Sequence, residues 1–186
     1  GLEEISENGI IFDGKEYEVD CIIFATGFEV GTDYSRRAGY QIHGSDGLTV
    51  SQKWGDGLST FHGMHSRGFP NSFFFGPAQS GFTATYTYSL DEQSIHLAYI
   101  LKKAKEQGAT RIEASEEAEE KWINTIVEKA RLTATFQENC TPGYYNNEGK
   151  VNQTPQNNTY GGGPIEFFSL MKKWRTKDNL EGLELS

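Results

Sequence analysis

The chain has 186 residues, a formal net charge of −9 and a hydrophobic share of 36%. A chain of this length holds one domain, or one domain with part of another. The acidic balance argues against a nucleic-acid partner, and no stretch approaches the roughly 20 apolar residues of a membrane span. Two cysteines, Cys21 and Cys140, and a start without a signal-peptide pattern favour a disulfide-free cytoplasmic protein.

The first expected elements are a hairpin and a buried strand. Residues 9–12 and 15–19 flank Asp13-Gly14, a pair that favours a tight turn between antiparallel strands. Residues 21–25 form a continuous apolar run, which is typical of a strand buried on both faces of a parallel sheet. The run ends at Ala25-Thr26-Gly27, where small residues allow a cofactor to approach.

The middle of the chain predicts loops and short strands, followed by a helix. Residues 32–63 are rich in glycine and polar residues, with a strand-like piece at 48–50. Residues 69–77 predict a second buried strand, and residues 78–82 a loop of small residues. The helix that follows ends near Gly108 and has a broad apolar face, formed by Leu90, Ile95, Leu97, Ala98, Leu101 and Ala104.

Two further helices and an extended tail are expected. Ser115 is the predicted N-cap of one helix, whose core stripe is Trp122, Ile123, Ile126, Val127 and Ala130. Pro164 opens the last helix, in which Ile165, Phe168, Met171 and Trp174 recur at helical spacing. The tail, with leucines at 180, 183 and 185, is expected to pack back as a short extended segment.

The strand–loop–helix at residues 73–90 is the best local candidate for a cofactor contact. A loop at a helix start presents backbone N–H groups to an acceptor, although an ordinary strand–helix connection explains the same pattern. A serine nucleophile at Ser80 is disfavoured because the residues around it are not Gly-x-Ser-x-Gly.

Other polar clusters have simple structural explanations. His62 and His65 lack further ligands at zinc-like spacing, so we expect no metal and two solvated or backbone-bonded histidines. The glutamate-rich run 113–121 is expected to form the solvent-exposed face of a helix. Residues 136–163 show no periodicity and are long enough to be an active-site wall or lid, with Tyr144 and Tyr145 able to stack on a ligand.

Several motifs, taken in order, resemble the type I Baeyer–Villiger monooxygenases, relatives of the flavin-containing monooxygenases. The strand ending in Ala-Thr-Gly-Phe at residue 28 is the first. The others are Lys53-Trp54, Phe61-His62-Gly63-Met64, Gly68-Phe69-Pro70-Asn71-Ser72-Phe73-Phe74, Gly76-Pro77, Glu92-Gln93, Tyr160-Gly161-Gly162-Gly163-Pro164 and Trp174-Arg175. The loop 140–149 resembles the branch that acts on bulky or cyclic ketones.

The resemblance implies an α/β fold, or α+β as a fragment, from the C-terminal part of a flavoprotein with two dinucleotide-binding domains. Short strands are followed by helices. Residues 1–26 would be terminal strands of the NADP-binding domain and the crossing to the FAD domain. Residues 27–186 would be the C-terminal part of the FAD-binding domain, with loop 136–163 covering the substrate and nicotinamide.

The resemblance also implies FAD and NADPH as cofactors. In the family, O2 adds to the reduced flavin, and the resulting peroxide attacks a ketone to give an ester or lactone. Residues carried over as cofactor-binding are Thr26, Gly27, Gln79, Thr85, Tyr86 and Thr87. Residues carried over to the substrate and nicotinamide side are Phe82, Tyr144, Tyr145 and Asn146.

The sequence lacks Gly-x-Gly-x-x-Gly, which forms the pyrophosphate site of such enzymes. It also lacks the segment that bears the family's arginine, so no catalytic residue is assigned. We therefore expect a chain that is inactive alone, whose partners are the N-terminal portion of the same enzyme, a ketone and O2. Two alternatives remain: a non-catalytic binding domain of the same fold, or part of an N- or S-hydroxylating monooxygenase.

Overall fold

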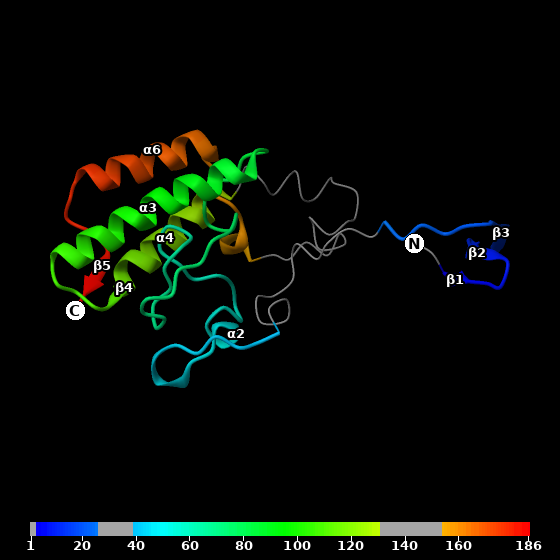
Figure 1. The fold of residues 1–186 in the computed structure, drawn as a ribbon, viewed down its shortest axis with the longest axis horizontal. Helices are drawn as coiled ribbons and strands as arrows, with labels where there is room; N and C mark the ends of the chain where they lie inside the picture. Colours follow the sequence, from blue (N-terminus) through cyan, green and yellow to red (C-terminus); the bar gives the residue numbers. More distant parts are fainter. Residues whose placement is uncertain (1–2, 26–38, 131–153) are drawn as a thin grey trace. The chain divides into compact units, whose positions relative to one another are not determined.

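The computed structural model describes residues 3–25, 39–130 and 154–186 (Figure 1). The chain divides into two compact units, Gly1–Val30 and Gly31–Ser186. The first unit contains strands β1 (Glu4–Ile5), β2 (Gly9–Phe12) and β3 (Lys15–Glu18). The second contains η1 (Ser45–Gly47), α2 (Val50–Lys53), α3 (Tyr86–Glu106), β4 (Ile112–Ala114), α4 (Glu116–Lys129), η3 (Pro155–Asn157), α6 (Gly163–Thr176) and β5 (Leu183–Leu185).

The first unit is an antiparallel three-stranded sheet in the order β1-β2-β3. Strands β2 and β3 pair from Gly9 with Glu18 to Phe12 with Lys15. Both turn residues are left-handed, with φ of 53° at Asp13 and 67° at Gly14, as a tight two-residue hairpin requires. The predicted hairpin is confirmed. Strand β1 was not predicted, because two residues carry no periodicity.

The buried strand predicted at residues 21–25 is wrong for this structure. These residues form no strand and are exposed, with Ile23 at 84% and Phe24 at 70%. Cys21, expected to be buried, is an exposed free thiol. An apolar run becomes a buried strand only where neighbouring strands pair with it, and no described residue does so here.

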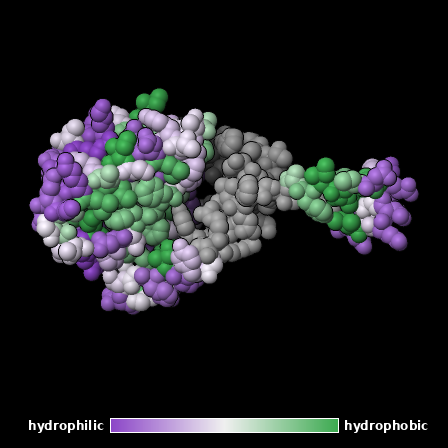
Figure 2. Space-filling view, viewed as in Figure 1, coloured by the Kyte–Doolittle hydropathy of each residue, from purple (hydrophilic) through white to green (hydrophobic). Residues whose placement is uncertain are grey.

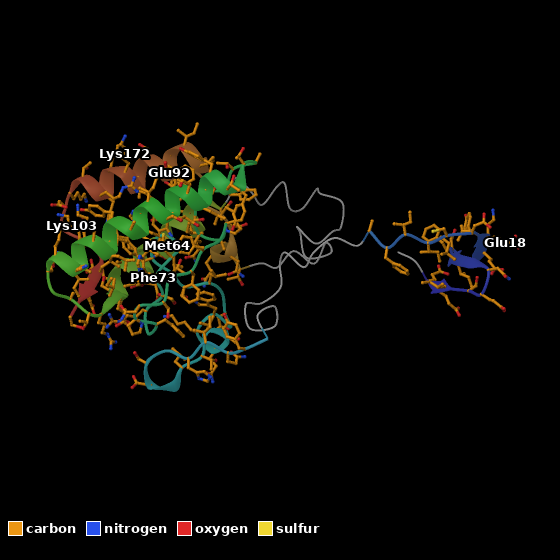
Figure 3. All side chains as sticks on the ribbon, viewed as in Figure 1. Glu18, Met64, Phe73, Glu92, Lys103 and Lys172 are labelled. Carbon is orange, nitrogen blue, oxygen red and sulfur yellow. The ribbon has the colours of Figure 1, made fainter. Side chains whose placement is uncertain are left out.

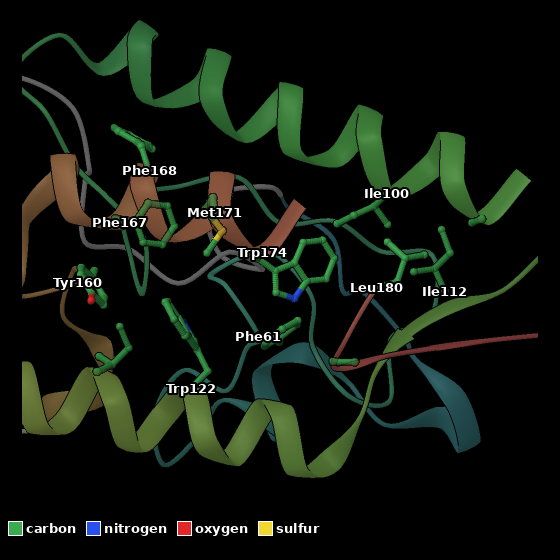
Figure 4. Close-up of a cluster of buried hydrophobic side chains, with 13 residues drawn as sticks. Phe61, Ile100, Ile112, Trp122, Tyr160, Phe167, Phe168, Met171, Trp174 and Leu180 are labelled. Atoms are coloured by element: carbon green, nitrogen blue, oxygen red, sulfur yellow. The ribbon is translucent and has the colours of Figure 1, made fainter. Parts of the chain in front are cut away.

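The second unit contains two hydrophobic clusters, a large one between α3, α4 and α6 and a small one formed by Val50, Phe69 and Phe74. Figure 4 shows the aromatic side chains that fill the large cluster, with Phe167 1% and Phe61 8% exposed. Trp122 on α4 stacks on Tyr160, with ring centroids 5.7 Å apart and planes at 8°. Aromatic rings contribute large buried areas, so this cluster accounts for most of the burial that holds the helices together.

Helices α3 and α6 pack against each other along their length. Lys103 and Glu92 of α3, both labelled in Figure 3, each form an ion pair with a residue in or just after α6. The Lys103 ammonium lies 2.8 Å from Asp178, and the Arg175 guanidinium lies 3.9 Å from Glu92. Lys103 and Asp178 are part-exposed, so their pair mainly fixes orientation and stabilises little.

The helix boundaries follow the predicted signals. Ser115 caps α4 by accepting a hydrogen bond of 3.2 Å from the Ala118 N–H. Pro164 lies in the first turn of α6, and Gly108, with φ of 71°, follows the end of α3. These predictions are confirmed. Of the residues noted at helical spacing in α6, Phe168, Met171 and Trp174 are buried, whereas Ile165 is 86% exposed.

The face of α3 that is buried differs from the predicted apolar face. Its buried residues are Ser89, Gln93, His96, Ile100 and Ala104. Ile95 and Leu101 are 46% and 43% exposed, and Figure 2 shows hydrophobic surface in the region that α3 crosses. The prediction failed because polar side chains on α3 make buried hydrogen bonds, described below, that a hydropathy pattern assigns to solvent.

The tail returns to the second unit as predicted. Strand β5 pairs antiparallel with β4, from Ile112 opposite Leu185 to Ala114 opposite Leu183. Leu180 is buried just before it. Strand β4 was not predicted, because its three residues lie between two helices and include Glu113.

Two other strand predictions are wrong. Residues 69–77 form no strand, since Asn71 takes a left-handed φ of 56° and interrupts any ladder. Thr49 and Val50 belong to a helix start, in which Thr49 caps α2 in a reciprocal capping box with Gln52. Among the described helices, none combines the length and apolar content needed to cross a bilayer.

Candidate functional site

The start of α3 gathers four of the predicted site residues. Thr85 is the N-cap, Tyr86 and Thr87 are the first two helical residues, and Phe82 lies in the preceding loop. All four are exposed, and the Phe82 and Tyr86 rings lie 5.9 Å apart. The structure thus brings an aromatic pair and two threonines together at one helix end.

Within the described part of the chain, no partner is recorded for the first backbone N–H groups at this helix end. The Thr85 side chain makes no capping hydrogen bond, and the first turn contains no acidic residue. The first N–H groups of a helix have no partner within the helix, and the helix dipole adds partial positive charge there. Tyr86 and Thr87 therefore present N–H groups that suit a carbonyl or an anionic ring edge.

The loop that leads to α3 is held by buried polar contacts. The Ser80 hydroxyl donates to the Gly76 carbonyl at 2.6 Å. The Gln93 amide, on α3, donates to the same carbonyl and to the Ser80 hydroxyl, both at 3.0 Å. Gly81 touches Phe167 so closely that an added Cβ would lie 2.7 Å from its ring. Because Ser80 is buried in these contacts, it is placed to shape the loop and not to attack a substrate.

Gln79 connects this loop to two distant segments. Its side chain accepts a 2.5 Å hydrogen bond from the Thr60 hydroxyl and donates to the carbonyls of Leu58, at 2.7 Å, and Gln156, at 2.8 Å. Gln79 is fully buried and has a left-handed φ of 55°. We call these four residues the Gln79 network. Both N–H donors of the Gln79 amide and its oxygen therefore each have a protein partner.

Residues 154–163 are the part of the predicted covering loop that the structure describes, and they contact the Gln79 network. Asn157 in η3 accepts a hydrogen bond of 2.7 Å from the Leu58 N–H. The Gln156 amide donates to the Leu58 carbonyl at 3.0 Å. The chain leaving residues 131–153 is thereby tied beside the start of α3. The predicted site residues Thr26, Gly27, Tyr144, Tyr145 and Asn146 lie outside the described residues.

The two histidines expected to be solvated are buried. His62 and His65 are 3% and 2% exposed, and they share the interior with His96, which is fully buried. Burial lowers the pKa of His65 to about 4 and that of His96 to about 3, so their imidazoles are neutral near pH 7. Among the described residues, no group of three histidine, cysteine or acidic side chains is placed to hold a metal ion.

Glu113 and Glu119, predicted to lie on a solvent-exposed helix face, are buried as well. Glu119 accepts hydrogen bonds from the Lys53 ammonium and the Arg67 N–H, both at 2.7 Å. Glu113 accepts from the Gly68 N–H at 2.7 Å. Burial alone raises the pKa of Glu113, but hydrogen bonds from Arg111 and Gly68 outweigh it and hold the pKa below its ordinary value. Both carboxylates bind the turn at residues 66–68, a role that no sequence pattern signalled.

The fold of this chain is similar to that of one segment of several monooxygenases of known structure. The polycyclic ketone monooxygenase of Thermothelomyces thermophila matches with a TM-score of 0.90 and 29% identity, over 100% of this chain and 31% of that chain. A closed structure of cyclohexanone monooxygenase matches with a TM-score of 0.79 and 26% identity, over 100% of this chain and 34% of that chain. No family model matches the sequence.

Sequence relatives point to the same family. Pentalenolactone D synthase of Streptomyces exfoliatus is 45% identical over 188 residues, which cover 100% of this chain and 32% of that protein. Baeyer–Villiger monooxygenase 4 of Dietzia sp. is 33% identical over 98% of this chain and 30% of its own length. The chain thus spans about a third of the curated relatives it matches.

Over its whole length the chain is homologous to the flavin-dependent Baeyer–Villiger monooxygenases, and it corresponds to their C-terminal portion. This confirms the resemblance found in the sequence. It also confirms the fold class, a mixture of short strands and helices taken from the flavin monooxygenase fold.

Proposed function

We propose that this chain is part of an FAD- and NADPH-dependent Baeyer–Villiger monooxygenase. The enzyme inserts one oxygen atom of O2 beside the carbonyl of a bulky or cyclic ketone and gives an ester or lactone. The observation that carries the proposal is the match of the entire chain to Baeyer–Villiger monooxygenases, at up to 45% identity among the relatives above. The name of the polycyclic ketone monooxygenase supports the substrate class.

The residues at the start of α3 fit an FAD site. The N–H groups of Tyr86 and Thr87 and the hydroxyl of Thr85 would bind the acceptor edge of the flavin ring, since they face outward and lack a capping side chain. When bound, FAD reduced by NADPH supplies the electrons that activate O2. Gln79 acts as a positioning residue, because its amide is fully used in holding the loop.

Other parts of the chain are assigned to the substrate and nicotinamide side. Phe82 is 47% exposed beside Tyr86 and offers an apolar wall for a ketone. Tyr144, Tyr145 and Asn146, in loop 136–163, would cover the nicotinamide and the substrate. Residues 1–26 would complete the NADP-binding domain and residues 27–186 the FAD-binding domain, with Thr26 and Gly27 at the crossing.

The chain alone is proposed to be inactive. It lacks the glycine fingerprint that binds a dinucleotide pyrophosphate, so the rest of the enzyme must supply that site. The chain's partners are accordingly the N-terminal portion of the same enzyme, a ketone and O2. The 186 residues purified alone should show no ketone-dependent NADPH oxidation. Such activity from the isolated chain would refute this point.

The enzyme class is tested on the complete protein. With a cyclic ketone, the expected result is NADPH oxidation with one lactone formed per NADPH consumed. Oxidation of an amine or a sulfide without any lactone would assign the protein to the hydroxylating relatives instead. Absence of bound FAD in a folded preparation would favour a non-catalytic binding domain.

The flavin contact is tested by removing one N–H group. Proline is tolerated at the first position of a helix, so Tyr86→Pro deletes a single donor without breaking α3. We expect FAD to bind about 5- to 30-fold more weakly than in Tyr86→Ala, which loses the ring but keeps the donor. Glu116→Pro makes the same change at the first position of α4 and should leave FAD affinity unchanged. Equal affinities for Tyr86→Pro and Tyr86→Ala would refute the contact.

A further inference from the structure

Among the described residues of the second unit, four buried side-chain polar atoms have no hydrogen-bond partner. They are His62 Nδ1, His65 Nε2, Gln93 Oε1 and His96 Nε2. All four side chains are buried, with exposures from 0% to 3%. A buried polar group without a partner costs on the order of 1–3 kcal/mol, so four in one region need an explanation.

The orientation of the Gln93 amide is fixed by its neighbours. Its nitrogen donates to the Gly76 carbonyl and to the Ser80 hydroxyl, and the Ser80 hydroxyl itself donates to Gly76. Turning the amide around would place its oxygen against the Gly76 oxygen. Gln93 Oε1 is therefore an unpaired acceptor, and only a donor can satisfy it.

The protonated nitrogen of His96 is fixed by Arg175. His96 Nδ1 lies 3.4 Å from the Arg175 guanidinium, which can only donate, so Nδ1 accepts. Because the His96 pKa is lowered to about 3, mainly by burial, the neutral ring carries its single proton on Nε2. His96 Nε2–H is therefore an unpaired donor.

Three of the side chains that carry these unpaired atoms are neighbours in the fold. Gln93 and His96 are one turn apart on the buried face of α3. The His62 ring lies 5.4 Å from the His96 ring, centroid to centroid. The residue after His62, Gly63, packs on Ser80, where an added Cβ would lie 2.9 Å from the Ser80 Cβ. The acceptor on Gln93, the donor on His96 and the ring nitrogen of His62 thus belong to neighbouring side chains.

We propose that these side chains form a binding site for internal water, which is held by Gln93 Oε1, His96 Nε2 and His62 Nδ1. A water molecule can accept a hydrogen bond from His96 Nε2–H and donate one to Gln93 Oε1 at the same time. Its second hydrogen or its second lone pair can then form a hydrogen bond with His62 Nδ1. Buried waters in proteins typically make about three such bonds. The site joins α3 to the turn at residues 61–65, against which the loop at residues 76–81 rests. It does not depend on the proposed function.

The direct test is a crystal structure of the complete protein at a resolution that shows ordered water. We expect a water peak within about 2.7–3.2 Å of His96 Nε2 and Gln93 Oε1. In His96→Phe this peak should disappear, whereas it should persist in His43→Phe, which changes an exposed histidine. A direct hydrogen bond between these side chains with no water would overturn the proposal, as would anomalous scattering from a metal.

A second measurement uses the protein without any substitution, so it does not require a variant to fold. Nitrogen NMR of histidine-labelled protein reports which ring nitrogen carries the proton. We expect His96 to remain neutral with the proton on Nε2 between about pH 6 and 8. A proton on Nδ1 would contradict the donor assignment and with it the proposed water.

Discussion

Replacing Gln79 by methionine tests whether the Gln79 network holds the helix start in place. Methionine is close in length and unbranched, so the substitution removes the amide while keeping most of the volume. The Thr60 hydroxyl and the Gln156 carbonyl then lose their buried partner, whereas Leu58 keeps a hydrogen bond from the Gln156 amide. Two orphaned groups at roughly 1–2 kcal/mol each predict a loss of about 2–4 kcal/mol.

The assay is thermal unfolding of the complete protein together with its FAD content. For a protein larger than about 250 residues each kcal/mol shifts the midpoint by roughly 2 °C or less, so the midpoint should fall by at most about 8 °C. FAD should bind more weakly because the loop before α3 loses its anchor. Gln107→Met, the same change at the exposed end of α3, serves as the control and should alter neither quantity. An unchanged midpoint and FAD affinity in Gln79→Met would refute the role assigned to the network.

Three further changes test other parts of the structure. Gly161→Ala should destabilise by several kcal/mol, measured by urea unfolding, because the new Cβ would lie 2.2 Å from the Lys129 carbonyl oxygen. Glu119→Gln should cost about 1–3 kcal/mol in the same assay, since Lys53 and the turn at 66–68 lose a charged acceptor. Burial lowers the folded-state pKa of His65 to about 4, below the ~6.5 of an unfolded histidine, so the unfolded chain takes up the proton first. Stability is therefore full above about pH 6.5 and falls as pH drops toward 4, by up to ~1.4 kcal/mol per pH unit for this residue.

Each of these tests has a matched control. Gly108→Ala also changes a glycine but meets no atom within 4 Å, so it should cost only about 1 kcal/mol for its left-handed backbone. Glu120→Gln removes an exposed carboxylate next to Glu119 and should be nearly neutral. His65→Phe should flatten the pH dependence between about pH 6 and 4. Equal effects in a variant and its control, or an unchanged slope in His65→Phe, would contradict the structural account.

The helices and their ends were largely predictable from the sequence. Signals such as the Ser115 cap, the Pro164 start and Gly108 act locally, within one turn, and need no tertiary partner. The Asp13-Gly14 hairpin was predictable for the same reason. The selection of Thr85 to Thr87 came from the family resemblance, since Thr85 makes no capping hydrogen bond that would mark the helix start.

The failures all involve contacts between distant residues. The apolar runs at 21–25 and 69–77 have the composition of strands, but pairing decides whether a strand forms. Glu119 is buried because Lys53 and the turn at residues 66–68 meet it there. The polar buried face of α3, with Gln93 and His96, was missed because the hydrogen-bond partners that these residues have lie far away in the sequence.

The Gln79 network has a consequence for the order of folding. Gln79 and Gln156 are separated by 77 residues, so their hydrogen bond can form only after a long loop closes. Contacts of such separation form late, whereas α3 and α4 can form from local signals alone. The helix start proposed to meet the flavin therefore exists before the loop in front of it has a fixed conformation. That loop acquires its shape only when the residues around 156 arrive from the ribosome and dock.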